Sequence, residues 1–166
     1  MSNTSLGKKF EAKFKKDWEE CFPNELVYRL PDQMSGYGAS NNPCDFFAFA
    51  DGNLFMTECK ETKEASIPWT SIRQRDKLIE YYHKGYKNVF QGVVIWFSEK
   101  DTVIYVSAQE MEKMVEDGEK SIGLRMLKSD YKKSYNIIVI PSEKVRTFMK
   151  SNYKYLVKTI LENRGE

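Results

Sequence analysis

We expect an α/β fold with a central mixed β-sheet flanked by helices, on three grounds. Segments with helical and strand-like hydrophobic spacing alternate along the chain in the order α-β-β-β-α-β-β-α-β-α. The run Gly92–Phe97 is continuously apolar, which is typical of a strand covered on both faces. No linker, repeat or low-complexity tract interrupts the 166 residues, so a single domain over residues 1–166 is expected.

The N-terminal part begins with a helical pattern from Ser5 to about Glu20. Its apolar stripe is formed by aromatic residues at i, i+4 and i+8, namely Phe10, Phe14 and Trp18. Leu26–Leu30 is predicted to be the first strand, because it is apolar and is ended by Pro31. Residues 32–42 are rich in Gly, Ser and Asn and are predicted to form a mobile loop.

A β-hairpin is predicted next, because Asp51-Gly52 separates two apolar runs. This turn would pair Ala50 with Asn53, and the register then follows outward. The further predicted pairs are Phe49 with Leu54, Phe47 with Met56, and Asp45 with Glu58.

The second half continues the alternation of helices and strands. A loop from Ser66 is expected to enter a helix around Thr70 that ends near Gly85. The remaining predicted elements are strands at Gly92–Phe97, Thr102–Ser107 and Asn136–Ile140, a helix at Ala108–Asp117, and a final helix from a Ser142 cap to about Asn163.

The composition is that of a globular protein, with 41% hydrophobic and 30% charged residues. The net charge of +2 is too small to establish nucleic-acid binding, but it permits a local basic surface. Three scattered cysteines indicate neither a disulfide framework nor a Cys-x-x-Cys metal pair, which favours a reducing, cytoplasmic setting. No segment is long and apolar enough to predict a membrane span or a signal peptide.

The predicted hairpin brings Asp45, Glu58 and Lys60 to one face of the sheet, because opposed residues and residues two apart share a face. Two opposed acids are destabilising unless a cation lies between them. Mg²⁺ prefers carboxylate oxygens and suits phosphodiester hydrolysis, so Asp45 and Glu58, with the carbonyl of Cys59, are candidate ligands. Lys60 would orient water or stabilise the transition state. The alternative is an exposed cross-strand cluster in which Lys60 only offsets two acids.

Glu11 is a fourth candidate catalytic residue. It lies in the middle of the first predicted helix, beside Phe10 and Phe14, from where it would reach the metal. A solvated ion pair with Lys15, four residues further on, explains Glu11 equally well.

The chain resembles Holliday junction resolvases of the RecU type, in the PD-(D/E)xK nuclease superfamily, over about its first 100 residues. The resemblance is carried by four short segments, which are Gly7-Lys8-Lys9-Phe10-Glu11, Tyr28-Arg29-Leu30-Pro31, Asp45-Phe46-Phe47 and Glu58-Cys59-Lys60-Glu61-Thr62, and continues through Ser66–Trp69 to the strand Val93–Phe97. It implies a restriction-endonuclease-like core that dimerises and cuts four-way DNA with Mg²⁺, for which Mn²⁺ would substitute. It also implies that Asp45 and Glu58 bind metal, that Lys60 is the catalytic lysine, and that Glu11 matches the acid of archaeal resolvases.

Two departures from the RecU pattern concern the region around the site. The family carries a glutamine on the helix after the third motif, where this sequence has Asp76, with Gln74 two residues earlier. Either residue is a candidate for supporting the metal ligands. The stalk that enters the junction is hard to identify here, because the turn at Asp51-Gly52 is tight.

DNA backbone contacts require cations on one surface. The candidates that flank the proposed site are Lys63, Arg73, Arg75 and Lys77, and Lys8, Lys9 and Arg29 are further candidates that would join them. Arg73 and Lys77, four residues apart, are expected on one helix face, which is also compatible with an ordinary solvated surface.

The sequence therefore favours a homodimeric, Mg²⁺-dependent endodeoxyribonuclease that cleaves branched DNA in recombination or repair. Two alternatives stay open: a less selective nuclease of restriction or phage type, and a DNA-binding module that kept the fold without catalysis. The intact Asp…Glu-x-Lys pattern argues against the second.

Overall fold

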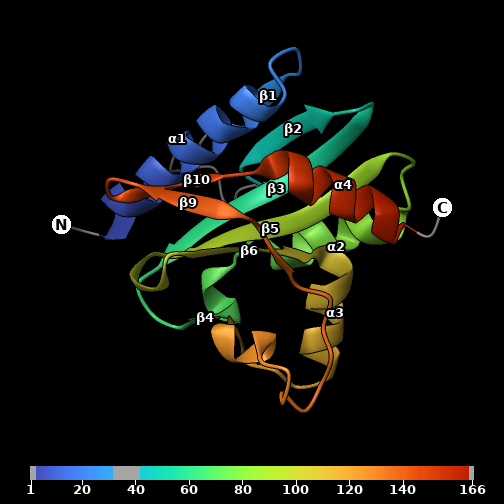
Figure 1. Ribbon diagram of the computed structural model, residues 1–166. Helices are drawn as coiled ribbons and strands as arrows, with labels where there is room; N and C mark the ends of the chain where they lie inside the picture. Colours follow the sequence, from blue (N-terminus) through green and yellow to red (C-terminus); the bar gives the residue numbers. More distant parts are fainter. Residues whose placement is uncertain (1–2, 32–41, 165–166) are drawn as a thin grey trace, which may run out of the picture.

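The computed structural model describes residues 3–31 and 42–164, with side chains from residue 7 on, and its centre is a six-stranded mixed sheet (Figure 1). The strand order is β1-β2-β3-β5-β6-β8, in which only the β3–β5 pair is parallel. The strands of this sheet are β1 (Val27–Arg29), β2 (Phe46–Ala50), β3 (Asn53–Thr62), β5 (Val89–Phe97), β6 (Thr102–Ser107) and β8 (Ile138–Val139). The expected α/β fold with a central mixed sheet is confirmed.

Helices cover both faces of the sheet (Figure 1). They are α1 (Asn3–Cys21), α2 (Arg75–Lys84), α3 (Ala108–Glu116) and α4 (Tyr153–Asn163). One core unites α1 and α4 with one face, and a second unites α2 and α3 with the other. Two short antiparallel ribbons and three 3₁₀ turns complete the described structure: β4 (Ser66–Pro68) with β7 (Ser121–Gly123), β9 (Ser142–Val145) with β10 (Phe148–Ser151), η1 (Trp69–Ser71), η2 (Ser98–Lys100) and η3 (Leu124–Leu127).

Helix α1 is held on the sheet by the aromatic stripe that its sequence predicts. Phe14 and Trp18 are fully buried and Phe10 nearly so. The ring of Phe14 lies 5.0 Å from Phe46 of β2 and 5.0 Å from Tyr153 of α4, measured between ring centroids. Burying a side chain of this size contributes about 2 kcal/mol, so the stripe fixes α1, and with it Glu11, relative to the sheet.

The hairpin between β2 and β3 has the predicted register. Asp51 and Gly52 both have positive φ, of 52° and 78°, as a tight two-residue turn of the primed type requires. Ala50 pairs with Asn53 and, at the outer end, Phe46 pairs with Thr57. Continuing this register by one residue places Asp45 opposite Glu58.

The prediction of one long final helix from Ser142 is wrong. Residues 142–151 form the β9–β10 hairpin, which turns at Arg146 in the left-handed conformation (φ 59°). Helix α4 begins only at Tyr153, where the Asn152 side chain accepts a hydrogen bond from the Tyr155 amide. The hairpin is fixed by distant contacts, since the buried Asp17 carboxylate accepts from the Ser151 amide at 3.0 Å and the Phe148 ring lies 5.7 Å from Trp96. Tertiary contacts here override local helix propensity.

The helix expected from about Thr70 starts later, at Arg75. The preceding segment is held by pairing with a distant part of the chain, because β4 pairs with β7 and the Trp69 indole donates to the Glu119 carbonyl at 2.7 Å. Its end agrees with the prediction, with Gly85 left-handed at φ 67°. No helix in the part of the chain that the structure describes combines the length and hydrophobicity of a membrane span.

Candidate active site

The candidate site lies where β3 runs past the end of β2. Strand β2 begins at Phe46, opposite Thr57, whereas β3 continues to Thr62 and stays paired with β5 on its other side. Asp45 immediately precedes β2, and its carbonyl accepts a hydrogen bond from the Leu30 amide at 2.8 Å just after β1. Three strands thus position the carboxylate of Asp45.

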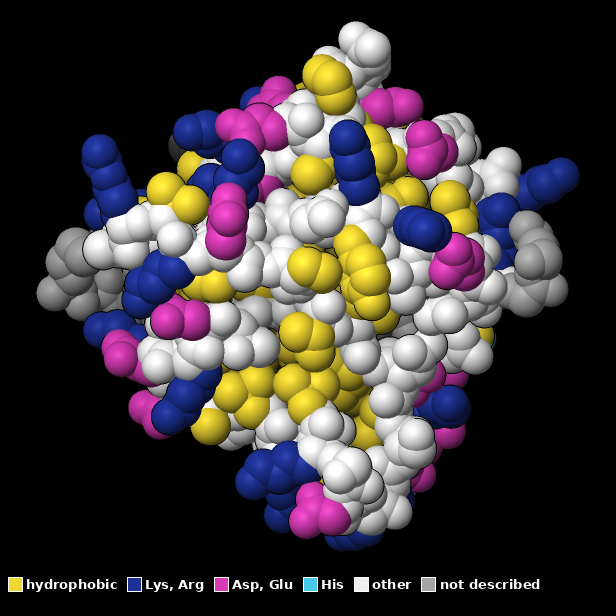
Figure 2. All heavy atoms as spheres, viewed as in Figure 1, with side chains coloured by type: hydrophobic (Ala, Val, Ile, Leu, Met, Phe, Trp, Pro, Cys, Tyr) yellow, Lys and Arg dark blue, Asp and Glu magenta, His cyan; other side chains and the backbone are white. Residues whose placement is uncertain are grey.

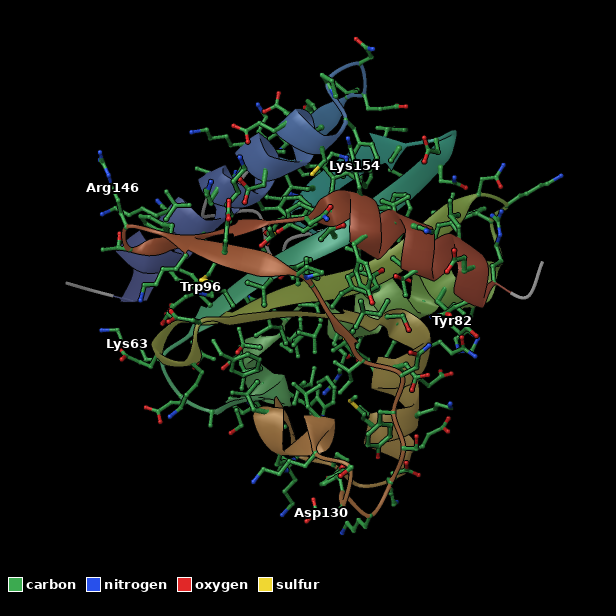
Figure 3. The ribbon with its side chains drawn as sticks, viewed as in Figure 1. Lys63, Tyr82, Trp96, Asp130, Arg146 and Lys154 are labelled. Carbon is green, nitrogen blue, oxygen red and sulfur yellow. The ribbon has the colours of Figure 1, made fainter. Side chains whose placement is uncertain are left out.

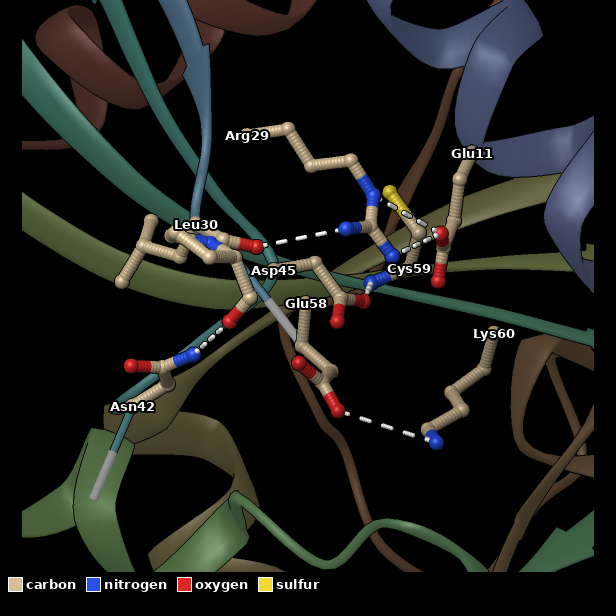
Figure 4. A network of polar contacts seen from close by, with 9 residues as sticks. Glu11, Arg29, Leu30, Asn42, Asp45, Glu58, Cys59 and Lys60 are labelled. Atoms are coloured by element: carbon tan, nitrogen blue, oxygen red, sulfur yellow. Dashed lines mark hydrogen bonds and ion pairs between the residues drawn. The ribbon is translucent and has the colours of Figure 1, made fainter. Parts of the chain in front are cut away.

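The Asp45 carboxylate turns toward the open edge of β3. Its Oδ2 accepts a hydrogen bond from the Cys59 amide at 2.9 Å, which satisfies a strand N–H that β2 does not reach (Figure 4). Burial raises the pKa of Asp45, and the bond from Cys59 and the charge of Lys60 oppose that rise. The carboxylate is therefore held in a fixed orientation at considerable desolvation cost.

Glu58 is the buried acid of the site, with 3% of its surface exposed. Burial, and next the charge of Asp45, raises its pKa to about 8. Its Oε1 makes no hydrogen bond to any described residue. A buried carboxylate in this situation requires either a proton or a cation.

Lys60 supplies a cation beside Glu58. It follows two residues later on the same strand, and its Nζ lies 3.6 Å from Glu58 Oε2. The structure thus brings Asp45, Glu58 and Lys60 together at one edge of the sheet, as the hairpin register predicts (Figure 4). Their chemical roles stay predictions.

The donor set fits a hard divalent cation. The two carboxylates are desolvated, and one oxygen lacks a partner, which a metal ion would satisfy. The Cys59 side chain lies in the core on the other face of the sheet, so only its backbone carbonyl is available to a metal. Within residues 3–31 and 42–164, no group of three or more His, Cys, Asp and Glu side chains is spaced to hold an ion, so backbone oxygen and water would have to complete the shell.

Glu11 pairs with Arg29. Its Oε2 accepts from Arg29 Nε at 3.2 Å and from Nη2 at 2.9 Å, while Nη1 donates to the Leu30 carbonyl at 3.3 Å. The expected alternative, an ion pair with Lys15, is wrong, because Lys15 pairs with Glu19 at 3.5 Å. Glu11 is nevertheless close enough to the site for its charge to raise the pKa of Glu58.

Arg29, predicted as a DNA contact, therefore links α1 to the end of β1, beside Asp45. Asn42 was not among the predicted site residues; its side-chain amide donates to the Pro31 carbonyl at 2.6 Å and so joins the described ends of the chain on either side of residues 32–41 (Figure 4). The Asn-Pro pair just before Cys44-Asp45 was the available signal. The loop predicted at residues 32–42 lies, apart from Asn42, outside the described residues.

The two candidates for the family glutamine lie at the start of α2. Gln74 is its N-cap, and its carbonyl accepts from the Leu78 amide at 2.9 Å. Asp76 has 85% of its side chain exposed and pairs with Arg75 at 3.2 Å. Neither has a recorded contact with Asp45 or Glu58, so their support of the metal ligands stays a prediction.

The predicted DNA-contacting cations differ in their surroundings. Arg73 precedes α2, so the prediction that it shares a helix face with Lys77 is wrong; Lys77 itself pairs with Glu80 at 3.6 Å. The Arg75 guanidinium lies 5.6 Å from the centre of the Trp69 ring. Lys8, Lys9 and Lys63 are exposed.

Lys63 follows directly on β3, on the same side of the molecule as Arg146 at the tip of the β9–β10 hairpin (Figure 3). Arg146 is an exposed cation that was not among the predicted DNA contacts, since the segment that carries it was predicted to be helical.

Comparisons with known proteins bear on the family and the fold. The family model described as RecU, Recombination protein U, matches residues 3–156, well past the first 100 residues that carry the resemblance in the sequence. The SPbeta prophage-derived uncharacterized protein YotM of Bacillus subtilis (strain 168) is 28% identical over 176 residues, covering 96% of this chain and 87% of that protein. The structure of Archaeoglobus fulgidus Hjc, a Holliday junction resolvase, aligns with a TM-score of 0.51 and 19% identity over 72% of this chain and 89% of that one. This shows the expected PD-(D/E)xK nuclease fold, and the chain belongs to the RecU family.

Proposed function

We propose that this protein is a Mg²⁺-dependent endodeoxyribonuclease that cleaves branched DNA, in particular four-way junctions, in recombination or repair. The observation that carries the proposal is the pairing of the half-buried Asp45 with the buried Glu58, with Lys60 beside them. Membership of the RecU family and the Hjc-like fold support the same conclusion.

The residues of the site have separate tasks in this reaction. Asp45 and Glu58, with the Cys59 carbonyl, would hold Mg²⁺, and Mn²⁺ is expected to substitute for it. When bound, the ion supplies charge neutralisation at the phosphate and lowers the pKa of water. Lys60 Nζ, anchored beside Glu58, donates toward the developing negative charge in a partly desolvated site. The Glu11–Arg29 pair fixes α1 against the end of β1, next to Leu30, whose amide donates to the Asp45 carbonyl.

The DNA would lie over the exposed cations around this edge. Lys8 and Lys9 on α1, Lys63 after β3, and the cations near α2 provide backbone contacts without base recognition. A four-way junction has two equivalent strands to cut, so we propose a homodimer that presents two such sites about a two-fold axis.

The decisive experiment compares Asp45→Asn with Asp51→Asn on a synthetic four-way junction, with and without Mg²⁺. Asp51 lies in the turn of the same hairpin, and asparagine tolerates its left-handed conformation. We expect Asp45→Asn to lose cleavage by a factor of at least ~10³ while still binding the junction, and Asp51→Asn to cut like the unaltered protein. Undiminished cutting by Asp45→Asn contradicts the assignment.

The same assay with linear duplex tests the substrate. Preferential cutting of the junction supports a resolvase, whereas equal cutting of both substrates indicates a less selective nuclease. Sedimentation of the free protein and of its junction complex tests the homodimer.

A further inference from the structure

A second concave site lies away from the carboxylates, where α2 ends and α3 begins. It is a pocket of about 410 Å³, within the range of small-molecule sites. The starts of β5 and α3 and the ends of β6 and α4 border it, and none of Asp45, Glu58 and Lys60 lines it. Figure 2 shows hydrophobic side chains gathered below α4 on the viewed face, and Ile160 of α4 and Ile138 of β8 both line the pocket.

The pocket contains a buried carboxylate with an unused oxygen. Glu110 is 6% exposed, and its Oε1 lies 3.4 Å from Lys113 Nζ. Its Oε2 has no hydrogen-bond partner in the described part of the chain. Ser107 and Glu110 have the spacing of a capping box, but only one half is formed, since the Ser107 hydroxyl accepts from the Glu110 amide at 3.2 Å. Leaving a buried carboxylate oxygen unpaired is costly, so a ligand that donates a hydrogen bond would relieve this cost.

Aromatic rings form the walls of the pocket. Tyr82, Tyr86, Phe90 and Tyr105 all line it, and Tyr86 is half exposed at 51%. The Tyr105 ring fills the space above Gly92, where a Cβ would lie only 2.3 Å from it. Gly92 therefore permits this position of the ring. Flat rings on several sides favour a planar heterocycle over a flexible chain.

A cation and a buried amide also border the pocket. The Arg164 guanidinium lies 5.6 Å from the centre of the Phe90 ring, and its Nη1 donates to Asn88 Oδ1 at 3.4 Å. Gln91 is 5% exposed, and its side-chain nitrogen donates to the Tyr81 carbonyl at 3.5 Å. The side-chain oxygen of Gln91 is the acceptor of the same amide group. Guanidinium groups bind phosphate well.

We infer that this pocket binds a nucleotide whose base carries an exocyclic amino group. The base would stack among the tyrosines, its amino group would donate to Glu110, and its phosphate would face Arg164. Adenine, cytosine and guanine carry such an amino group, whereas thymine has at position 4 a carbonyl oxygen that Glu110 repels and donates only from N3–H. This site is independent of the proposed nuclease chemistry, and its Tyr82 lies on the opposite side of the molecule from Lys63 (Figure 3).

Titration of the full chain with dCMP and dTMP in the absence of Mg²⁺ tests the inference, because the two pyrimidines have similar size and differ in the amino or carbonyl group at position 4, in the proton on N3 and in the 5-methyl group. Protein NMR or calorimetry should show dCMP binding at least ~10-fold tighter than dTMP. Equal affinity for the two, or binding of neither dCMP, dAMP nor dGMP, overturns the proposal.

A variant pair tests the role of Glu110 itself. Glu110→Met removes the acceptor at similar volume and should lower dCMP affinity at least ~10-fold, with little loss of thermal stability, since a buried oxygen without a hydrogen bond is removed and the lost ion pair with Lys113 involves an exposed lysine. Glu116→Met, at an exposed position of the same helix, is the matched control and should bind dCMP unchanged. Unchanged dCMP binding by Glu110→Met contradicts the inference, and if that variant does not fold, the comparison of dCMP with dTMP decides.

Binding of oligonucleotides to the Asp45→Asn variant distinguishes an unpaired base of DNA from a free nucleotide as the ligand. This variant is used because, under the proposed function, it does not cleave the oligonucleotide. If the pocket takes an unpaired base of DNA, a short oligo(dC) should bind at least ~10-fold tighter than dCMP and compete with it. If it takes free nucleotides, dCMP should bind at least as tightly. Failure of Asp45→Asn to abolish cleavage would refute the nuclease assignment without affecting this binding test.

Discussion

Glu58 and Glu110 are two buried glutamates with similar immediate contacts and different surroundings. Each has one oxygen near a lysine, at 3.6 Å for Lys60 and 3.4 Å for Lys113, and one oxygen without a partner in the described residues. Glu58 has a second, half-buried acid, Asp45, beside it, whereas Glu110 lines a pocket together with aromatic residues. Two desolvated acids at one point favour a small multivalent cation, and a single acid in an aromatic pocket favours an organic donor.

The largest expected difference between the two regions is in the effect of their lysines on cleavage. Lys60→Met should lower the cleavage rate of a four-way junction by a factor of about 10²–10³, because it removes a positioned donor from a desolvated site. Lys113→Met should leave the rate unchanged. Single-turnover rates at saturating Mg²⁺ provide the measurement, and a rate loss of the same size in both variants would show that the two sites are not separate.

The second prediction concerns the pH dependence of Mg²⁺ binding at the carboxylate site. The pKa of Glu58 is raised to about 8, so at neutral pH the metal-free site holds a proton that Mg²⁺ must displace. Affinity should therefore rise by about tenfold per pH unit from pH 6 to 8 and level off above that. The raised pKa of Asp45 acts in the same direction.

Calorimetry with Mg²⁺ at several pH values measures this dependence. Glu58→Gln should weaken binding and reduce the slope, while Glu110→Met should keep the slope of the unaltered protein. An affinity that is constant from pH 6 to 8 would contradict the assignment of Glu58 as a ligand.

The sequence predicted the geometry of the carboxylate site because a short local signal determines it. Asp51-Gly52 fixes the turn, the turn fixes the register of β2 and β3, and the register places Asp45 opposite Glu58. The aromatic stripe of α1 is local in the same sense. These features require no knowledge of distant contacts.

The remaining features depend on residues far apart in the sequence. The β9–β10 hairpin is held by Asp17, which is 134 positions from Ser151, and a local reading of the segment predicted a helix. Glu11 pairs with Arg29, 18 positions away, whereas helix spacing suggested Lys15 as one of two alternatives. The nucleotide pocket is assembled from β5, β6, α3 and α4, and its signal at Glu110 is a missing hydrogen bond, which only the structure shows.

The smallest expected effect is that of a single exposed lysine near each region on the binding of junction DNA. Lys63→Ala should weaken junction binding only a few-fold, because one phosphate contact is lost. For the same reason, the slope of log affinity against log salt concentration should decrease in magnitude by about one. Lys84 is also exposed and lies beside Gly85 at the nucleotide pocket, and Lys84→Ala should leave the slope unchanged. Fluorescence anisotropy with a labelled junction between 50 and 200 mM salt, on the Asp45→Asn background, measures both slopes. If Lys84→Ala lowers the slope and Lys63→Ala does not, the junction lies over the pocket that contains Glu110. The proposal that it lies over the sheet edge that contains Glu58 would then be wrong.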